Sequence, residues 1–347
     1  MGAPEISVII ASDRVGPDLD GCLASLAAQE GAPPFEVLVV SAKEPARRDD
    51  LLVGWIRMDE RNPAARRNRG ADFAAGRLLA FIDDDARATA GWLARAVEVS
   101  RRTPLFGGID VLPGGSGYGE RLADLLLATP VIGSAVPAHE RSPRGGAVRL
   151  PSDLALCNLF VERSLRDRLQ GFDETLGYIG EDTDFVHRAM KSGVVPELDP
   201  GLVVRHRRRA LPGPFLAQRW RYRVKSGRRL VERPDGAPVA RIATFLGGAA
   251  AAAVAVALFG RRFAVPAAAA YAATAWSLSA PIWRRDPALF PAVPAAFFLH
   301  HANYAIATSA GIGAALFDRW RGVVPRRRSP EAAAGGPLPP EPAPDHR

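Results

Sequence analysis

The sequence predicts an α/β fold with a doubly wound sheet, followed by an α-helical membrane region. Three short apolar runs, at residues 6–10, 36–40 and 78–82, alternate with helical patterns at 18–29 and 63–76. This β-α-β-α-β order is typical of a parallel sheet with helices on both faces. By contrast, residues 242–317 contain one acid, Asp286, and four arginines. The two parts are therefore suited to different solvents.

The formal net charge of +8 has a local origin. Arginines concentrate between residues 205 and 233, directly ahead of the apolar region. This placement favours a basic belt that meets anionic head groups or a diphosphate over a nucleic-acid partner, with a solvated helix surface as the plain alternative. Cys22 and Cys157 have neither metal-ligand nor disulfide spacing, and no export signal precedes residue 6. We therefore expect a reduced, cytoplasmic catalytic domain.

The predicted catalytic domain covers residues 1–235, with residues 205–235 as its basic juxtamembrane segment. Residues 106–149 are rich in Gly and Pro around one helical patch at 119–127. A strand is expected at 154–161 and a helix from 180 to about 191. Ligands of such a sheet bind beyond the carboxyl ends of its strands.

The predicted membrane region covers residues 240–318. Residues 242–259 and 263–283 are each close to the length that spans a bilayer, although a buried soluble hairpin is the alternative. Prolines and histidines interrupt a third apolar segment at 288–317, which either spans the bilayer or lies at its interface. Arginines at 284–285 and 326–328 favour two spans, because cytoplasmic loops are positively charged. The Pro-rich residues 329–347 are expected to be disordered.

Three acids end the third apolar run. Asp83 and Asp85 alternate, so their side chains share one side of the chain while Asp84 points away. Adjacent carboxylates repel one another unless a cation is present, and hard divalent cations prefer oxygen ligands. The run therefore predicts a Mg²⁺ or Mn²⁺ site that also carries a diphosphate. A solvated acidic turn is the alternative.

A second acidic cluster, at residues 180–184, opens a predicted helix. Acids there are favoured by the helix dipole, and simple capping would explain them. In a direct displacement at a sugar carbon, however, one carboxylate deprotonates the attacking hydroxyl while a metal stabilises the leaving diphosphate. Asp182 together with the first cluster would be sufficient for that reaction.

Five motifs follow one another along the chain: VII at 8–10, ARRNRG at 65–70, FIDDD at 81–85, GFDE at 171–174 and EDTD at 181–184. In this order and spacing, residues 5–230 resemble the family-2 glycosyltransferases of GT-A fold. The resemblance implies a mixed, mostly parallel sheet flanked by helices. It also implies a nucleotide-diphosphate-sugar donor, inversion at the anomeric carbon and no covalent enzyme intermediate.

The resemblance also assigns roles to individual residues. Asp182 matches the catalytic base, and Glu181 would help to hold the acceptor. The residues expected at the donor are Ser12, Asp13, Arg67, Asp83 and Asp84. The expected metal ligands are Asp85, Asp83 and His206. The residues expected at the acceptor or diphosphate are Gln218, Arg219 and Trp220. For His206 a lone surface histidine is the alternative, and for residues 218–222 an interfacial helix.

One position departs from the family pattern. Ser41 stands where many members carry a nucleobase-binding aspartate, so base recognition is in doubt and Asp13 is a possible substitute. We expect single sugar addition to a lipid-linked or cell-envelope glycan at the inner membrane face. The competing hypotheses are a catalytically silent membrane scaffold and a nucleotidyltransferase. Residues 11–14 lack the Gly-rich loop that is typical of the latter.

Overall fold

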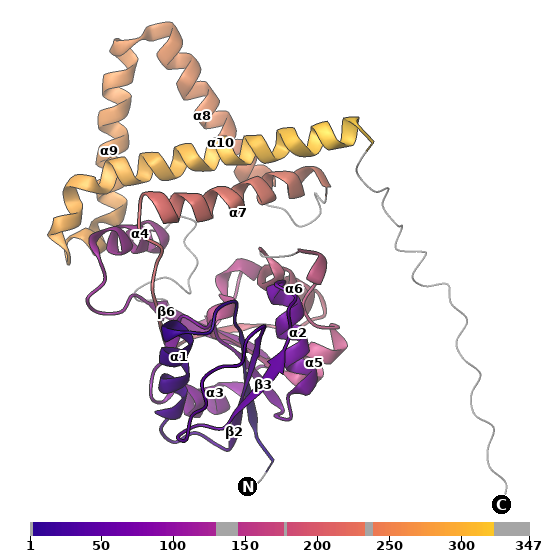
Figure 1. Ribbon diagram of the computed structural model, residues 1–347. Coiled ribbons are helices and arrows are strands. Elements are labelled where there is room, and N and C mark those ends of the chain that lie inside the picture. Colours follow the sequence, from indigo (N-terminus) through magenta and orange to yellow (C-terminus); the bar gives the residue numbers. More distant parts are fainter. Residues whose placement is uncertain (1–2, 130–144, 177–178, 233–238, 323–347) are drawn as a thin grey trace, which may run out of the picture.

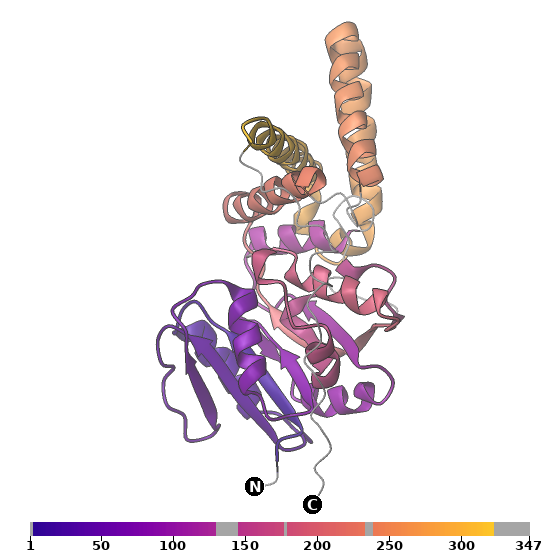
Figure 2. The same ribbon diagram turned by 90° about the vertical axis from the view of Figure 1, so that its right-hand side faces the viewer.

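The computed structural model describes residues 3–129, 145–176, 179–232 and 239–322. A nine-stranded sheet lies between two groups of helices, and a layer of long C-terminal helices covers one edge of it (Figures 1 and 2). The predicted disordered tail at 329–347 lies outside the described residues.

The first half of the sheet is parallel, as predicted. Its strand order is β3-β2-β1-β4, formed by β3 (Val53–Arg57), β2 (Phe35–Ser41), β1 (Ile6–Ala11) and β4 (Leu78–Phe81). On one face Ile6, Val8 and Ile10 pack against α1 (Pro17–Ala27) and α3 (Trp92–Ser100). On the other, Ile9 packs towards α2 (Pro63–Phe73) and α6 (Glu181–Lys191). Burial on both faces explains why β1, β2 and β4 are continuous apolar runs.

The second half of the sheet is mixed, as the resemblance implied, because it adds antiparallel strands to the parallel first half. Here β8 (Leu159–Glu162) runs antiparallel to β4 and to β6 (Leu105–Val111). Strand β6 is parallel to β9 (Glu197–His206), while β5 (Ala86–Ala88) and β7 (Gly146–Ala147) are antiparallel to it. Within the predicted strand at 154–161, residues 156–158 form a 3-10 turn and β8 begins only at Leu159. Strand β6 forms where a Gly- and Pro-rich region was expected.

Two helices connect this sheet to the C-terminal layer. Helix α4 (Tyr118–Ala128) follows β6 and matches the predicted patch at 119–127. After β9, α7 (Gly213–Glu232) passes over the edge where β4 and β9 end (Figure 1). The short helix α5 (Arg163–Arg168) follows β8.

The C-terminal helices lie where the sequence places them. Helices α8 (Val239–Phe259) and α9 (Arg261–Trp283) form a hairpin that projects away from the sheet (Figure 1). The third segment is not interrupted as expected: after the 3-10 turn η5 (Pro287–Ala292), α10 (Val293–Trp320) is one helix. Within the described residues, none of the helices combines the length and the apolar character that crossing a bilayer requires, and the predicted spans are not supported.

Glycines allow α10 to lie directly on α7. A Cβ atom at Gly311 would overlap the carbonyl oxygen of Val224, and one at Gly227 would overlap that of Thr308. The two backbones are therefore in contact, a spacing that only residues without side chains permit.

Candidate active site

Three predicted metal ligands come together at the carboxyl end of β4. One ligand atom from each of Asp83, Asp85 and His206 lies within 4.8 Å of the others. Sheet register explains this, because Ala86 of β5 pairs with His206 at the end of β9. The Nε2 atom of His206 is 3.0 Å from Oδ1 of Asp85. Two carboxylates and an imidazole are a donor set that fits Mn²⁺ or Mg²⁺.

The Asp85–His206 contact perturbs both groups. Burial opposes the charged form of Asp85, but the hydrogen bond from His206, together with the positive charges of His206 and Arg209, lowers the pKa of that carboxyl. Burial likewise opposes the charged form of His206, yet Asp110 and Asp85 raise its pKa well above the usual value. The carboxylates of Asp85 and Asp110 thus favour a positive charge at His206. A divalent cation would supply that charge in place of the proton on the imidazole.

Arg67 joins the two acidic clusters. Its side chain projects from α2 and donates to Oδ1 of Asp83 at 2.9 Å and to Oε1 of Glu181 at 3.1 Å. Arg67 and Glu181 are buried. The arginine therefore fixes the start of α6 beside the metal ligands, and the carboxylate of Glu181 is already engaged by it.

Asp182 lies in the first turn of α6, after a left-handed turn at Gly180 (φ 88°). Its Oδ1 atom accepts a hydrogen bond from the backbone N–H of Thr183 at 2.6 Å. Burial nevertheless raises the pKa of Asp182, and burial also raises the pKa of Glu181. A carboxylate with a raised pKa is a better proton acceptor, as a general base requires.

The predicted donor residues after β1 form a connected group. The buried hydroxyl of Ser12 donates to Oδ2 of Asp84 at 2.6 Å, and burial raises the pKa of Asp84 to about 6. Arg66 contacts the carbonyl of Ser12 and donates to Oδ1 of Asp13 at 3.1 Å. The side chain of Asp13 is 52% exposed, so it remains accessible to a ligand.

Ser41, which departs from the family pattern, has its hydroxyl engaged within the protein. Its hydroxyl is buried and donates to the carbonyl of Lys43 at 2.6 Å. It also accepts a hydrogen bond from Trp55 Nε1 at 3.2 Å. The single hydroxyl hydrogen is therefore used within the protein.

Helix α7 brings some, but not all, of the predicted acceptor residues to the site. Gln218 contacts the hydroxyl of Tyr222 at 3.4 Å, and Arg219 lies over the Tyr222 ring at 5.7 Å. Burial raises the pKa of Tyr222, and the charges of Asp182, Asp83 and Glu181 contribute to the same shift. Tyr222 is therefore within electrostatic range of these three acids. Trp220 is 40% exposed. Its role at the acceptor or diphosphate stays a prediction.

The far end of α7 contacts the helix that carries Asp182. Arg229 lies 3.8 Å from Asp184, and a Cβ atom at Gly180 would be 3.1 Å from the same guanidinium group. Helix α7 therefore spans the site from the β9 side to α6.

Sequence reasoning missed a buried charged group beside His206. Asp110, at the end of β6, lies 3.5 Å from Nδ1 of His206 and is bound by Arg208 through both of its oxygens. Arg208 also donates to Asp124 of α4 at 3.1 Å. An acid that ends an apolar strand was the signal that identified Asp83, and it would have identified Asp110 had β6 been recognised.

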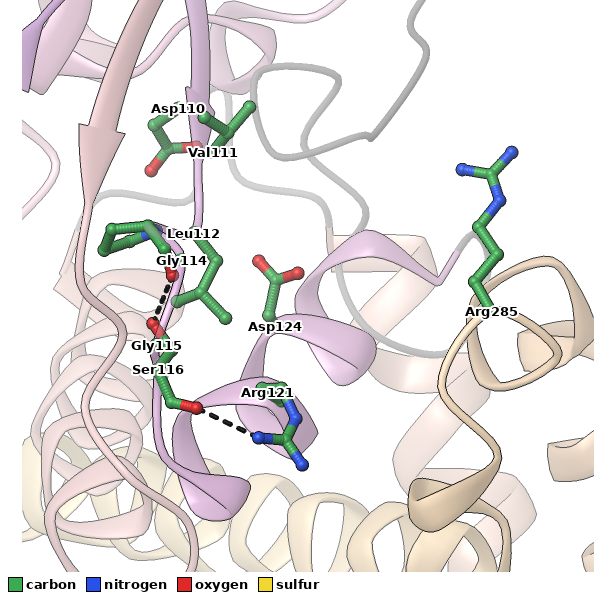
Figure 3. A pocket seen from close by; sticks show the side chains of 10 residues that line it. Asp110, Val111, Leu112, Gly114, Gly115, Ser116, Arg121, Asp124 and Arg285 are labelled. Carbon is green, nitrogen blue, oxygen red and sulfur yellow. Dashed lines mark hydrogen bonds between the residues drawn. The ribbon is translucent and has the colours of Figure 1, made fainter.

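Asp110 and Asp124 also line a cavity of about 500 Å³ (Figure 3). The loop at residues 111–116 forms one wall, and Arg121 of α4 and Arg285, from the turn after α9, also line the cavity. Arg121 donates to the carbonyl of Ser116 at 3.0 Å and to Asp286 at 2.8 Å. The cavity is polar and adjoins the metal ligands through Asp110.

The N-terminal third of the chain is similar to a known protein family. Residues 7–121 match the family described as Glycosyl transferase family 2. That range contains β1, α2 and the acids after β4, and the match supports a glycosyltransferase activity for this part of the chain. No curated protein matches the chain.

Solved structures similar to this chain include two of low sequence identity. TarS residues 1–349 from S. aureus are 15% identical, with 92% of each chain covered and a TM-score of 0.45. The mannosyltransferase PcManGT from Pyrobaculum calidifontis, in complex with GDP-Man and Mn²⁺, is 21% identical, with 92% of this chain and 88% of that one covered and a TM-score of 0.47.

Proposed function

We propose that the protein transfers a sugar from a nucleotide-diphosphate sugar to a hydroxyl acceptor, with inversion and with Asp182 as the base. The observation that carries the proposal is the double contact of Arg67. It places the metal-ligand cluster at Asp83 beside the helix start that holds Asp182. Direct displacement needs these two functions on opposite sides of one sugar carbon.

The residues of this chain divide the reaction between them. The carboxylate of Asp182 accepts the proton of the attacking hydroxyl as the new glycosidic bond forms. Arg67 orients both acidic clusters, and Ser12, Asp84 and Asp13 form the donor side. Asp83, Asp85 and His206 would hold a divalent cation, which supplies positive charge to the departing diphosphate.

The donor half of the proposal is tested by calorimetric titration of nucleoside diphosphates in Mn²⁺, with wild-type protein and with Asp85→Asn. We expect one nucleotide to bind only with the metal and to lose affinity in the variant. Lys43→Ala, outside the cluster, serves as the control. A folded wild-type protein that binds none of the nucleotides would refute the donor assignment.

We further propose that the acceptor is a lipid-linked or cell-envelope glycan reached at the cytoplasmic membrane surface. Large apolar side chains are exposed on the projecting hairpin, including Leu258 (72%) and Val265 (63%). The outer side of α10 exposes Phe298 (63%) and Trp320 (80%). Exposed apolar groups beside a basic helix such as α7 favour contact with an anionic lipid surface.

Co-sedimentation with vesicles tests this location. Wild-type protein is expected to bind vesicles of phosphatidylglycerol and phosphatidylcholine more than vesicles of phosphatidylcholine alone. Leu258→Asp with Val265→Asp should weaken that binding. Val195→Asp is the matched control, because Val195 is 62% exposed but lies between α6 and β9. Equal binding by all three proteins would refute the location of the lipid contact.

A further inference from the structure

We propose that Asp110 is a positioning residue that orients His206 towards the divalent cation. Its carboxylate lies on the opposite side of the imidazole from Asp85. The proposal rests on the proposed function, since it concerns the cation that the transferase would use.

The imidazole of His206 lies between two carboxylates. Nε2 is 3.0 Å from Asp85, while Nδ1 is buried and lies 3.5 Å from Oδ2 of Asp110. A histidine that ligates a metal through one ring nitrogen usually donates the hydrogen of the other to a carboxylate or carbonyl. With the hydrogen on Nδ1 facing Asp110, the lone pair of Nε2 is left for a cation that Asp83 and Asp85 would also hold.

Asp110 is itself held in a fixed orientation. Arg208 binds both of its oxygens and also donates to its backbone carbonyl at 3.2 Å. The side chains of Asp110 and Arg208 are 1% and 5% exposed. A buried, bidentate arginine–carboxylate pair has little freedom to rotate, so the carboxylate presents one defined face to His206.

The same arginine provides a matched comparison. Arg208 also binds Asp124, whose side chain is 5% exposed, at 3.1 Å. Asp110 and Asp124 are thus two buried aspartates on one guanidinium group, but the ion-pair contact to His206 is made by Asp110. Asparagine at either position removes the negative charge of one aspartate that binds Arg208. The change at Asp110 also replaces the carboxylate that lies beside Nδ1 of His206.

Mn²⁺ binding, followed by loss of the free-ion electron paramagnetic resonance signal without any sugar donor, tests the proposal. Asp110→Asn is expected to weaken binding by about 10- to 100-fold, the usual effect of losing a partner of a metal-ligating histidine. Asp124→Asn should weaken binding less than Asp110→Asn does, because Asp124 is connected to the imidazole through Arg208 and Asp110. Asp110→Asn combined with His206→Gln should bind no more weakly than His206→Gln alone, because Asp110 acts through the imidazole.

Several results would overturn the proposal. Wild-type affinity in Asp110→Asn, an equal loss in Asp124→Asn, or additive losses in the double variant would each show that Asp110 does not act through His206. Failure of the wild-type protein to bind Mn²⁺ would do the same. If Asp110→Asn does not fold, Asp110→Glu keeps the charge but displaces the carboxylate, and unchanged Mn²⁺ binding in it would count against the proposal. Mn²⁺ binding without sugar transfer would instead refute the proposed function alone.

Discussion

The guanidinium group of Arg67 binds the buried carboxylate of Glu181 at 3.1 Å, across 114 positions of sequence. This contact connects α2 to the first turn of α6. It is the direct link between the family-matched part of the chain and the later segment that carries the proposed base.

Removing this link should lower stability as well as activity. In Arg67→Ala, Glu181 would keep a buried charge without its partner, which costs about 3 kcal/mol of the free energy of unfolding. Urea denaturation measures the change. Arg69→Ala on the same helix is the control, because Arg69 is exposed and its contact is the ring of Phe73. Equal stability of the two variants would mean that the pair does not hold α6.

Asp182→Asn should impair catalysis without impairing donor binding. Loss of a general base lowers kcat by about 10²- to 10⁴-fold. The amide has nearly the same shape, so nucleotide affinity in Mn²⁺ should be unchanged. Kinetics together with calorimetry separate the two effects, and a variant that kept most of its kcat would exclude Asp182 as the base.

The pH dependence of kcat/KM should reflect the environment of Asp182. Burial raises the pKa of this carboxyl from its ordinary 3.8. The ionised form is the base, so activity is present above the raised pKa and is lost as pH falls through it. The acid limb of the profile should therefore lie above that of an ordinary aspartate. A limb at the ordinary value would contradict the assignment.

The contact between α7 and α10 gives a further prediction. In Gly311→Ala the new methyl group would overlap the Val224 carbonyl, so we expect a loss of about 1–3 kcal/mol in unfolding free energy. Gly313, two residues further along α10, has open space around it, and Gly313→Ala should be neutral or stabilise the helix by up to about 1 kcal/mol. Thermal unfolding of both variants checks this difference, and a similar effect of the two would show that the helices are not in close contact.

Much of the first half of the fold was predictable because its strands are buried on both faces and are separated by helices of regular period. The second half was not. Strand β6 contains Gly107 and Gly108, which weaken a strand signal, yet a side chain at Gly108 would overlap the Leu202 carbonyl of the adjacent strand β9. Antiparallel insertion of β8 depends on such long-range contacts rather than on local pattern.

The site was predictable wherever an acid ended a recognised element. Asp83, Asp85 and His206 are brought together as expected. The missed residues, Asp110 and Arg208, depend on the pairing of β6 with β9. The sequence showed that Ser41 departs from the family pattern, but it did not predict the hydrogen bond from Ser41 to the Lys43 carbonyl. Nothing in the local sequence indicates which acceptor a hydroxyl will find.

The contact of Arg229 with Asp184 limits where the chain can be truncated. Helix α7 belongs by sequence to the basic segment beside the apolar region, and trimming such a tail is a common way to obtain material for crystallisation. Here the removed segment would include Tyr222, whose pKa is affected by the charge of Asp182, and Arg229, which contacts Asp184 on the helix of Asp182. A chain that stopped after β9 would expose the reaction centre on one side.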